Sequence, residues 1–287
     1  MGIALEWITS NLDIASVGHG RFWCDYLVYK EKIATYRRAP GKRGPAKCPD
    51  IVASDSSGLM YLIECKGTTT TSNYTTDQFN RSAFDQKTSV EFDDESKVAQ
   101  RLASGVFIAR HDSFEGSQLR IADPPPETRE EEPVCLVEAT TLQMSRALKA
   151  DTITRSLLAA GFVPEALSLM PESTNQSWNP KVEGHDTFRA NDVEWQGRIE
   201  RFDLPVPLRI NNREYRVATI RDGVSRGFLH RIRQLPPSDR NNDELLDSAQ
   251  IRLQPVLEHD GAREVEELYG GVRHGDVAIR DITLSLE

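Results

Sequence analysis

Two short apolar segments joined by a tight turn constrain the fold of this chain more than any other feature. Residues 49–53 (PDIVA) and 59–66 (LMYLIECK) have the length and side-chain content of strands, and Asp55-Ser-Ser-Gly58 between them is typical of a turn. The second segment is apolar on both faces up to Ile63, which is the pattern of a buried strand. We therefore expect the two strands to pair through this turn within a buried sheet.

Helical and extended patterns surround this pair of strands. Aromatic residues recur at helical spacing in residues 21–32, and the segment 142–160 is helical up to Gly161, which we expect to act as a left-handed cap. We also predict a helix over 96–102 and strands over 33–38, 105–110 and 133–139. The elements from residue 21 to residue 66 therefore follow the order helix, strand, strand, strand.

The length of 287 residues favours two domains. The Pro-rich and Ser-rich stretch 171–180 resembles a linker, so we predict one domain over residues 1–170 and a second over 171–287. In the second domain Asn211-Asn212 and Asp222-Gly223 are hairpin signals, which predict a β-meander. Its strands are expected at 202–210, 213–221 and 224–233, followed by helices at 243–249 and 263–269 and a strand at 278–286. The expected fold class is α/β for the first domain, with a β-rich α+β second domain.

Several classes of protein are disfavoured by what the sequence lacks. No apolar run approaches the ~20 residues of a membrane helix, and the N-terminus does not read as a secretory signal, so we expect a cytoplasmic protein without a membrane partner. The four cysteines have no CxxC spacing, which predicts reduced thiols. The six histidines lack zinc-hydrolase spacing, and no phosphate-binding P-loop motif is present.

Basic residues cluster directly before the first strand of the pair. The formal net charge is −9, but affinity for a polyanion depends on where the cations gather. Five cations without an intervening acid stand in one short segment: Arg37, Arg38, Lys42, Arg43 and Lys47. We predict that they contact a nucleic-acid backbone. A solvated surface loop is the alternative interpretation.

Two acids and a lysine lie where the strands are expected to meet. Alternation along a strand points Glu64 and Lys66 to one face, and pairing through the turn brings Asp50 near Glu64. Two carboxylates are hard ligands suited to Mg²⁺ or Mn²⁺. The Lys66 ammonium would then orient or help deprotonate an attacking water and stabilise charge on a phosphate. The alternative is a cross-strand ion pair on a solvated face.

Pro49-Asp50 followed by Glu64-Cys65-Lys66 resembles the signature of the PD-(D/E)xK nuclease superfamily. The resemblance covers roughly residues 15–165 and implies a restriction-endonuclease-like core, a mixed sheet flanked by helices and entered by an N-terminal helix. It also implies site residues beyond the motif. These are Asp25 as an additional metal-binding acid, with Glu31 as the fallback, the Cys65 backbone carbonyl as a metal ligand, and Gln86, ahead of Gln78, as a helix-borne catalytic residue.

The resemblance further implies an activity and a setting. The expected activity is that of a Mg²⁺-dependent phosphodiesterase, a DNA endonuclease of a bacterial restriction or anti-phage defence system. A partner helicase or ATPase would control it, the second domain would serve recognition, assembly or regulation, and cleavage of both strands would favour a homodimer. Two alternatives stay open: a non-catalytic module that binds nucleic acid or a partner, and an RNA-directed or structure-specific nuclease.

Overall fold

The computed structural model describes the chain in segments that form two compact units. The described residues are 2–37, 47–69, 89–110, 114, 116–122, 134–171, 184–190, 192–210, 212–235, 243–249, 251, 253–256, 267–275 and 277–285. The first unit comprises Met1–Asp151 and Pro171–Ser173, and the second comprises Thr152–Met170 and Thr174–Glu287. Each unit has its own sheet and core, and among the described residues no helix is long and apolar enough to cross a membrane.

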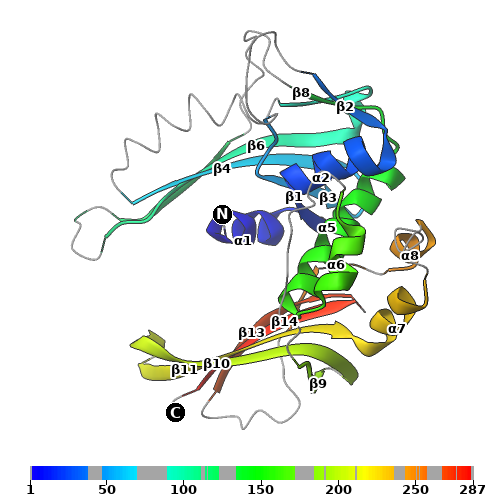
Figure 1. The fold of residues 1–287 in the computed structure, drawn as a ribbon. Coiled ribbons are helices and arrows are strands. Elements are labelled where there is room, and N and C mark those ends of the chain that lie inside the picture. Colours follow the sequence, from blue (N-terminus) through cyan, green and yellow to red (C-terminus); the bar gives the residue numbers. More distant parts are fainter. Residues whose placement is uncertain are drawn as a thin grey trace. The chain divides into compact units, whose positions relative to one another are not determined.

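A five-stranded mixed sheet is the centre of the first unit (Figure 1). In spatial order its strands are β1 (Ile14–His19), β3 (Ile51–Asp55), β4 (Met60–Thr68), β6 (Val98–Phe107) and β7 (Gln118–Ala122). β3 and β4 pair antiparallel, whereas β4 and β6 run parallel. The predicted pairing through the turn at 55–58 is therefore confirmed, and it makes β4 an interior strand.

The apolar residues of β4 are buried on both of its faces. Met60, Leu62 and Ile63 are fully buried, and Ile63 shares a core cluster with Ile8 of α1 (Gly2–Asn11) and with Leu102 of β6. Burial on two sides explains why this strand is almost continuously apolar in sequence. It also means that a charged residue at the end of β4 enters a region with little water.

The first unit also contains a second, smaller sheet and several helices. A second sheet contains β2 (Ala34–Arg37), β8 (Val134–Val137) and β5 (Val90–Phe92), in that spatial order. The predicted helix over 21–32 is present as α2 (Gly20–Asp25) followed directly by the π-helix η1 (Tyr26–Glu31). Trp23 of α2 is fully buried, and its indole N–H donates to the Met144 carbonyl at 3.1 Å. Met144 lies on α5 (Thr141–Ala159), which ends near Gly161 at φ +90°, as the cap signal predicts.

The second unit contains a six-stranded antiparallel sheet. Its strands are, in spatial order, β12 (Leu253–Val256), β13 (Glu267–His274), β14 (Ala278–Ser285), β11 (Arg213–Ser225), β10 (Val193–Ile210) and β9 (Asp186–Ala190). Its helices are α6 (Val163–Leu169), α7 (Arg226–Gln234) and α8 (Asp243–Ser248). Phe188, Trp195 and Ile279 form its buried core cluster. The protein is therefore mixed α/β in its first unit and has a mostly antiparallel β-sheet in its second.

Three predicted segments do not have the expected secondary structure. Residues 96–102 are not a helix but the short 3₁₀ helix η3 (Glu95–Lys97) and the start of β6. Residues 226–234 form α7 and not a strand, because Phe228, Leu229 and Ile232 are buried at helical spacing behind the Ser225 cap. The segment 263–269 also differs, since β13 begins at Glu267 and the residues before it lie outside the described part.

The Asp222-Gly223 signal marks close packing and not a turn. Both residues lie inside β11, paired with Arg198 and Gly197 of β10. A Cβ on Gly223 would lie 2.6 Å from the Phe188 ring and 3.0 Å from Trp195. Glycine is therefore required here for the approach of two aromatic core residues. The Asn211-Asn212 signal is a true hairpin position, with Asn212 at φ +64° between β10 and β11.

Candidate metal and phosphodiester site

The pairing of β3 with β4 brings Asp50 and Glu64 together. Asp50 directly precedes β3, and the register that pairs Ile51 with Ile63 places it opposite Glu64. The backbone N–H of Asp50 donates to the Glu64 carboxylate at 3.3 Å. The backbone N–H of Cys65 in turn donates to the Asp50 carboxylate at 2.9 Å. Two carboxylates thus share one end of the strand pair and are held there by the backbone.

Lys66 joins this pair from the same face of β4. Its ammonium group donates to the Glu64 carboxylate, which is 0% exposed, while the Lys66 side chain is 23% exposed. The Glu64 carboxylate is therefore inaccessible to solvent, whereas the Lys66 ammonium, which is bonded to it, is partly exposed. A polar molecule that approaches from solvent meets Lys66 before it meets Glu64.

Burial changes the acid–base behaviour of Glu64. Its pKa is raised from 4.5 to about 7, first by burial and further by the neighbouring Asp50, although the hydrogen bond with Lys66 lowers it. The charged form is thus disfavoured in spite of the ammonium beside it. A further cation at this position would stabilise the charged carboxylate.

Cys65 lies between these residues but contributes its backbone. Its side chain points to the opposite face of β4 and packs against the core cluster around Ile63. Burial is the first cause that raises the pKa of its thiol to about 12, and Asp50 raises it further. A thiol with that pKa is a poor nucleophile at neutral pH. The proposed role of the Cys65 carbonyl as a metal ligand stays a prediction.

Asp25 is buried in a separate hydrogen-bond network. Arg21, one helical turn before it on α2, contacts its carboxylate at 2.8 Å, and the Tyr36 hydroxyl donates to it at 2.6 Å. Burial is the first cause that keeps the pKa of Tyr36 well above its ordinary value, so this phenol remains a donor. In the described segments no three His, Cys, Asp or Glu side chains come close enough to hold one metal ion. Asp25 therefore remains a predicted third acid, now with known partners.

Gly20 brings the start of α2 into close contact with the segment that carries Asp50. Its backbone N–H donates to the Asp50 carbonyl at 3.1 Å. A Cβ at this position would lie 2.0 Å from the Pro49 carbonyl oxygen, so a side chain here would force the backbone to shift. The sequence pattern indicated the aromatic stripe of this helix, whereas the close approach of the helix to Pro49 depends on Gly20. A glycine at the first position of the helix was the available signal for this close approach.

The remaining predicted site residues are only partly covered by the structure. Arg37 is exposed at the end of β2, and Lys47 is half-buried three residues before Asp50. Arg38, Lys42 and Arg43 lie outside the described residues, as do Gln86 and its alternative Gln78. The basic segment thus begins and ends at described positions of the first unit. Its contact with nucleic acid stays a prediction.

Several arginines of the second unit form ion pairs with aspartate or glutamate side chains. The sequence places six arginines between residues 213 and 233, and four of these have acidic partners. The pairs are Arg216 with Glu214, Arg221 with Asp281, Arg226 with Glu194 and Arg233 with Glu165. The Arg221–Asp281 pair is the most buried, since its acid is 0% exposed. Arg221 is therefore held in a buried ion pair, whereas the side chains of Arg216, Arg226 and Arg233 are 49–66% exposed.

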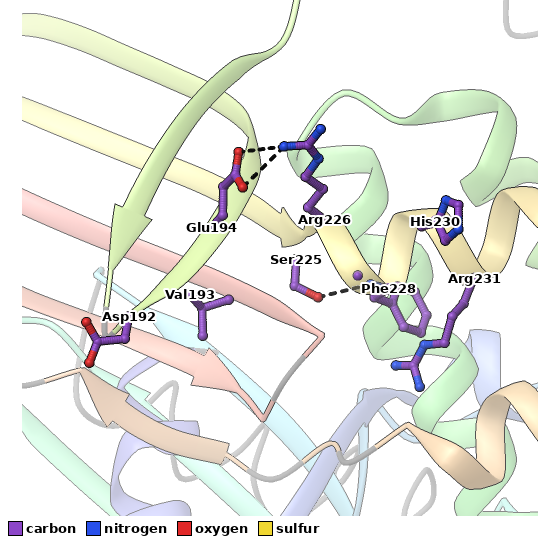
Figure 2. A pocket seen from close by; sticks show the side chains of 9 residues that line it. Asp192, Val193, Glu194, Ser225, Arg226, Phe228, His230 and Arg231 are labelled. Atoms are coloured by element: carbon purple, nitrogen blue, oxygen red, sulfur yellow. Dashed lines mark hydrogen bonds and ion pairs between the residues drawn. The ribbon is translucent and has the colours of Figure 1, made fainter.

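An open pocket of about 750 Å³ lies between β10 and α7 (Figure 2). Arg226 and Glu194 pair across it at 3.0 Å, and the Ser225 hydroxyl accepts the Phe228 N–H at 3.2 Å. His230, on the same helix, is hydrogen-bonded to Gln234 at 2.8 Å. The polar groups named here bond within the chain, which is typical of a surface hollow with a structural lining.

Comparisons of the chain with protein-family models, with curated proteins and with solved structures find no match. Among the described residues, the strongest feature is a buried glutamate held between a second acid and a lysine.

Proposed function

We propose that the protein is a Mg²⁺-dependent phosphodiesterase that acts on DNA as an endonuclease. The observation that carries the proposal is the placement of Asp50, Glu64 and Lys66 at one end of the β3–β4 pair. The elements around them also agree with a nuclease core of the PD-(D/E)xK type, since a helix precedes the strands and β4 lies inside a mixed sheet.

The chemistry of the two acids fits a divalent cation. Glu64 is fully buried beside Asp50, and its pKa of about 7 reflects a charge that the protein alone does not fully stabilise. Carboxylate oxygens are the ligands that Mg²⁺ prefers, with water and substrate phosphate completing its shell. Asp50 and Glu64 would hold the ion, with the Cys65 carbonyl and Asp25 as further candidates. When bound, Mg²⁺ supplies Lewis-acid stabilisation of the phosphate and a more acidic water.

Lys66 is placed to act on the attacking water and on the phosphate. Its ammonium group is hydrogen-bonded to the Glu64 carboxylate, and the Lys66 side chain is exposed enough for an incoming substrate to reach it. A positioned cation of this kind stabilises the charge that develops on the phosphate oxygens in the transition state. It also holds a water by hydrogen bonding at its nitrogen, which orients the water for attack on phosphorus.

A purely structural Glu64–Lys66 pair is the competing explanation. An ion pair at the end of a buried strand costs desolvation, and the raised pKa of Glu64 indicates that this cost is not fully repaid. A structural pair has no need of Asp50 beside it, since the second acid raises the pKa of Glu64 further. The presence of all three groups therefore favours a metal-dependent function.

The biological setting is a further part of the proposal. We propose a role in a bacterial restriction or anti-phage defence system, with an ATPase or helicase partner that controls the nuclease. Two strand cuts by a single-site enzyme would require a homodimer or two binding events. The basic segment that ends at Lys47, three residues before Asp50, supports a polyanionic substrate because its charges lie next to the site in sequence.

The experiment is cleavage of supercoiled plasmid, single-stranded DNA and RNA by purified protein in Mg²⁺, in Mn²⁺ or in EDTA. Wild type is compared with Glu64→Gln and Lys66→Met, which keep the shape of each side chain. Glu91→Gln, at an exposed residue of β5, and Lys30→Met on η1 are matched controls. We expect metal-dependent cleavage of DNA that falls by at least about 1000-fold in Glu64→Gln and about 100–1000-fold in Lys66→Met.

Other outcomes would select the alternatives. Salt-dependent DNA binding without cleavage would indicate a binding module or a missing activating partner, and cleavage of RNA alone would indicate an RNA-directed nuclease. Cleavage that survives both substitutions in folded protein would show that the reaction takes place elsewhere. Circular dichroism of each variant separates loss of activity from loss of fold.

A further inference from the structure

The hairpin end of β10 and β11 continues past the strands that flank it in the sheet of the second unit (Figure 1). β9 pairs with β10 only at Val193–Gly197, and β14 pairs with β11 only at Val217–Val224. Within the described part of the chain, the segments 204–210 and 212–216 therefore have no neighbouring strand but each other. These two segments form a two-stranded ribbon, which we call the β-ribbon.

The β-ribbon is basic in a chain that is acidic overall. Its residues include three arginines and one glutamate, whereas the whole chain has a formal net charge of −9. Arg209 pairs with Glu214 across the two strands, and Arg216 lies 3.8 Å from the same carboxylate. The two arginine side chains are 70% and 66% exposed. Because two guanidinium groups share one acid, this part of the β-ribbon keeps a net positive charge that faces solvent.

The exposed side chains of the β-ribbon are of the kinds that contact DNA. Asn212 turns the chain at its tip with φ +64°, and both Asn212 and Arg213 are exposed. Arginine and asparagine bind base edges through paired hydrogen bonds, and apolar side chains contact the thymine methyl group. Val206 and Leu208 supply apolar groups that are 75% and 44% exposed. The β-ribbon thus combines cations, an amide and apolar groups.

An added protein strand is a poorer partner for this hairpin than a polyanion. β10 carries Pro205 and Pro207 here, and proline has no backbone N–H to donate to an added strand. The pairing of β10 with β11 also shifts in register between Asp203 and Leu208. Prolines and register shifts of this kind hinder edge-to-edge pairing of strands. Side chains, and not the backbone, are therefore the binding groups that the β-ribbon offers.

We propose that the β-ribbon binds in the major groove of duplex DNA. This groove is about 12 Å wide and admits a two-stranded ribbon, whose strands are about 4.8 Å apart. Arg209 and Arg216 contact phosphates, and Asn212 and Arg213 at the tip reach base edges. Duplex RNA does not fit, because its major groove is deep and narrow. The choice of DNA rests on the proposed function, which this inference extends by giving the second unit the recognition of a duplex.

The test is the binding of fluorescein-labelled duplex DNA to the purified full chain, measured by fluorescence anisotropy in EDTA so that cleavage does not interfere. Wild type is compared with a ribbon variant that carries Arg209→Gln, Arg213→Gln and Arg216→Gln. A control variant has the same change of charge at exposed positions of α7, namely Arg226→Gln, Arg231→Gln and Arg233→Gln. We expect the ribbon variant to bind at least about 10-fold more weakly, with a salt slope lower by about 2, and the control to stay within about 3-fold of wild type.

A second measurement uses wild type alone and does not depend on the folding of a variant. Arginines are modified with phenylglyoxal in the presence and absence of duplex DNA, and the modified peptides are quantified by mass spectrometry. We expect DNA to protect Arg209 and Arg216 and to leave Arg226 as reactive as before. Equal reactivity of all three with and without DNA would overturn the proposal.

The binding assay can overturn the proposal in three further ways. These are an absence of duplex DNA binding by wild type, wild-type affinity and salt slope in a ribbon variant that is folded by circular dichroism, and equally tight binding of duplex RNA of the same sequence. Cleavage in Mg²⁺ separates this inference from the proposed function. Binding that depends on the β-ribbon without any cleavage would refute the nuclease alone, whereas cleavage by wild type with unchanged binding by the ribbon variant would refute the β-ribbon alone.

Discussion

Replacement of Glu64 by glutamine is expected to stabilise the protein above neutral pH. Burial raises the pKa of Glu64 from 4.5 to about 7, so the folded protein holds a proton on this group at pH values where the unfolded chain has lost it. The contribution of Glu64 to folding stability is therefore fully present below pH 4.5 and is lost as the pH rises through about 7. A rise of this size corresponds to about 3 kcal/mol in the free energy of unfolding.

Urea denaturation at several pH values measures this effect directly. Between pH 4 and pH 8 the stability of Glu64→Gln relative to wild type should increase by about 3 kcal/mol, because glutamine has no charge to bury. Glu91→Gln, an exposed glutamate on β5, is the matched control and should leave the difference near zero. A stability difference between wild type and Glu64→Gln that stays constant over this range would refute the assignment of a raised pKa to Glu64.

Four further outcomes follow from the same geometry. Mg²⁺ at 100 times its dissociation constant should stabilise wild type at pH 8 by about 2.7 kcal/mol and leave Glu64→Gln unchanged in the same denaturation assay. Gly20→Ala should cost about 1–3 kcal/mol, because its Cβ meets the Pro49 carbonyl at 2.0 Å, whereas Gly227→Ala, with open space around it, should not lower the melting temperature. Tyr36→Phe should cost about 1–3 kcal/mol in urea denaturation, since it leaves one oxygen of buried Asp25 without its donor. Burial, Arg155 and Arg280 lower the pKa of His274 from 6.5 to about 4. Wild type should therefore lose stability as the pH falls from 6.5 towards 4, and His274→Gln should lose less. An equal loss of stability in both proteins would contradict this prediction.

The pairing of β3 with β4 could be predicted from the sequence because the residues that determine it are close together in the chain. An apolar strand, a turn and a second strand lie within eighteen residues, from Pro49 to Lys66, so strand pairing and side-chain alternation place Asp50 beside Glu64. The cap at Gly161 and the hairpin at Asn212 were equally local. In each case, the residues that determine the geometry are neighbours in the chain.

Predictions failed where distant packing decides the local structure. Gly223 reads as a turn residue, but its lack of a side chain serves the contact of Phe188 with Trp195. The segment after Ser225 has strand-like composition, yet Phe228 and Ile232 bury one helical face.

The decisive measurement is the rate of plasmid cleavage in Mg²⁺ by wild type and by Glu64→Gln, each shown to be folded by circular dichroism. We expect nicking or linearisation by wild type that EDTA stops, and a rate at least about 1000-fold lower for Glu64→Gln. Equal cleavage by the two proteins in Mg²⁺ would contradict the central claim that the buried acid pair of β3 and β4 forms a metal-dependent active site.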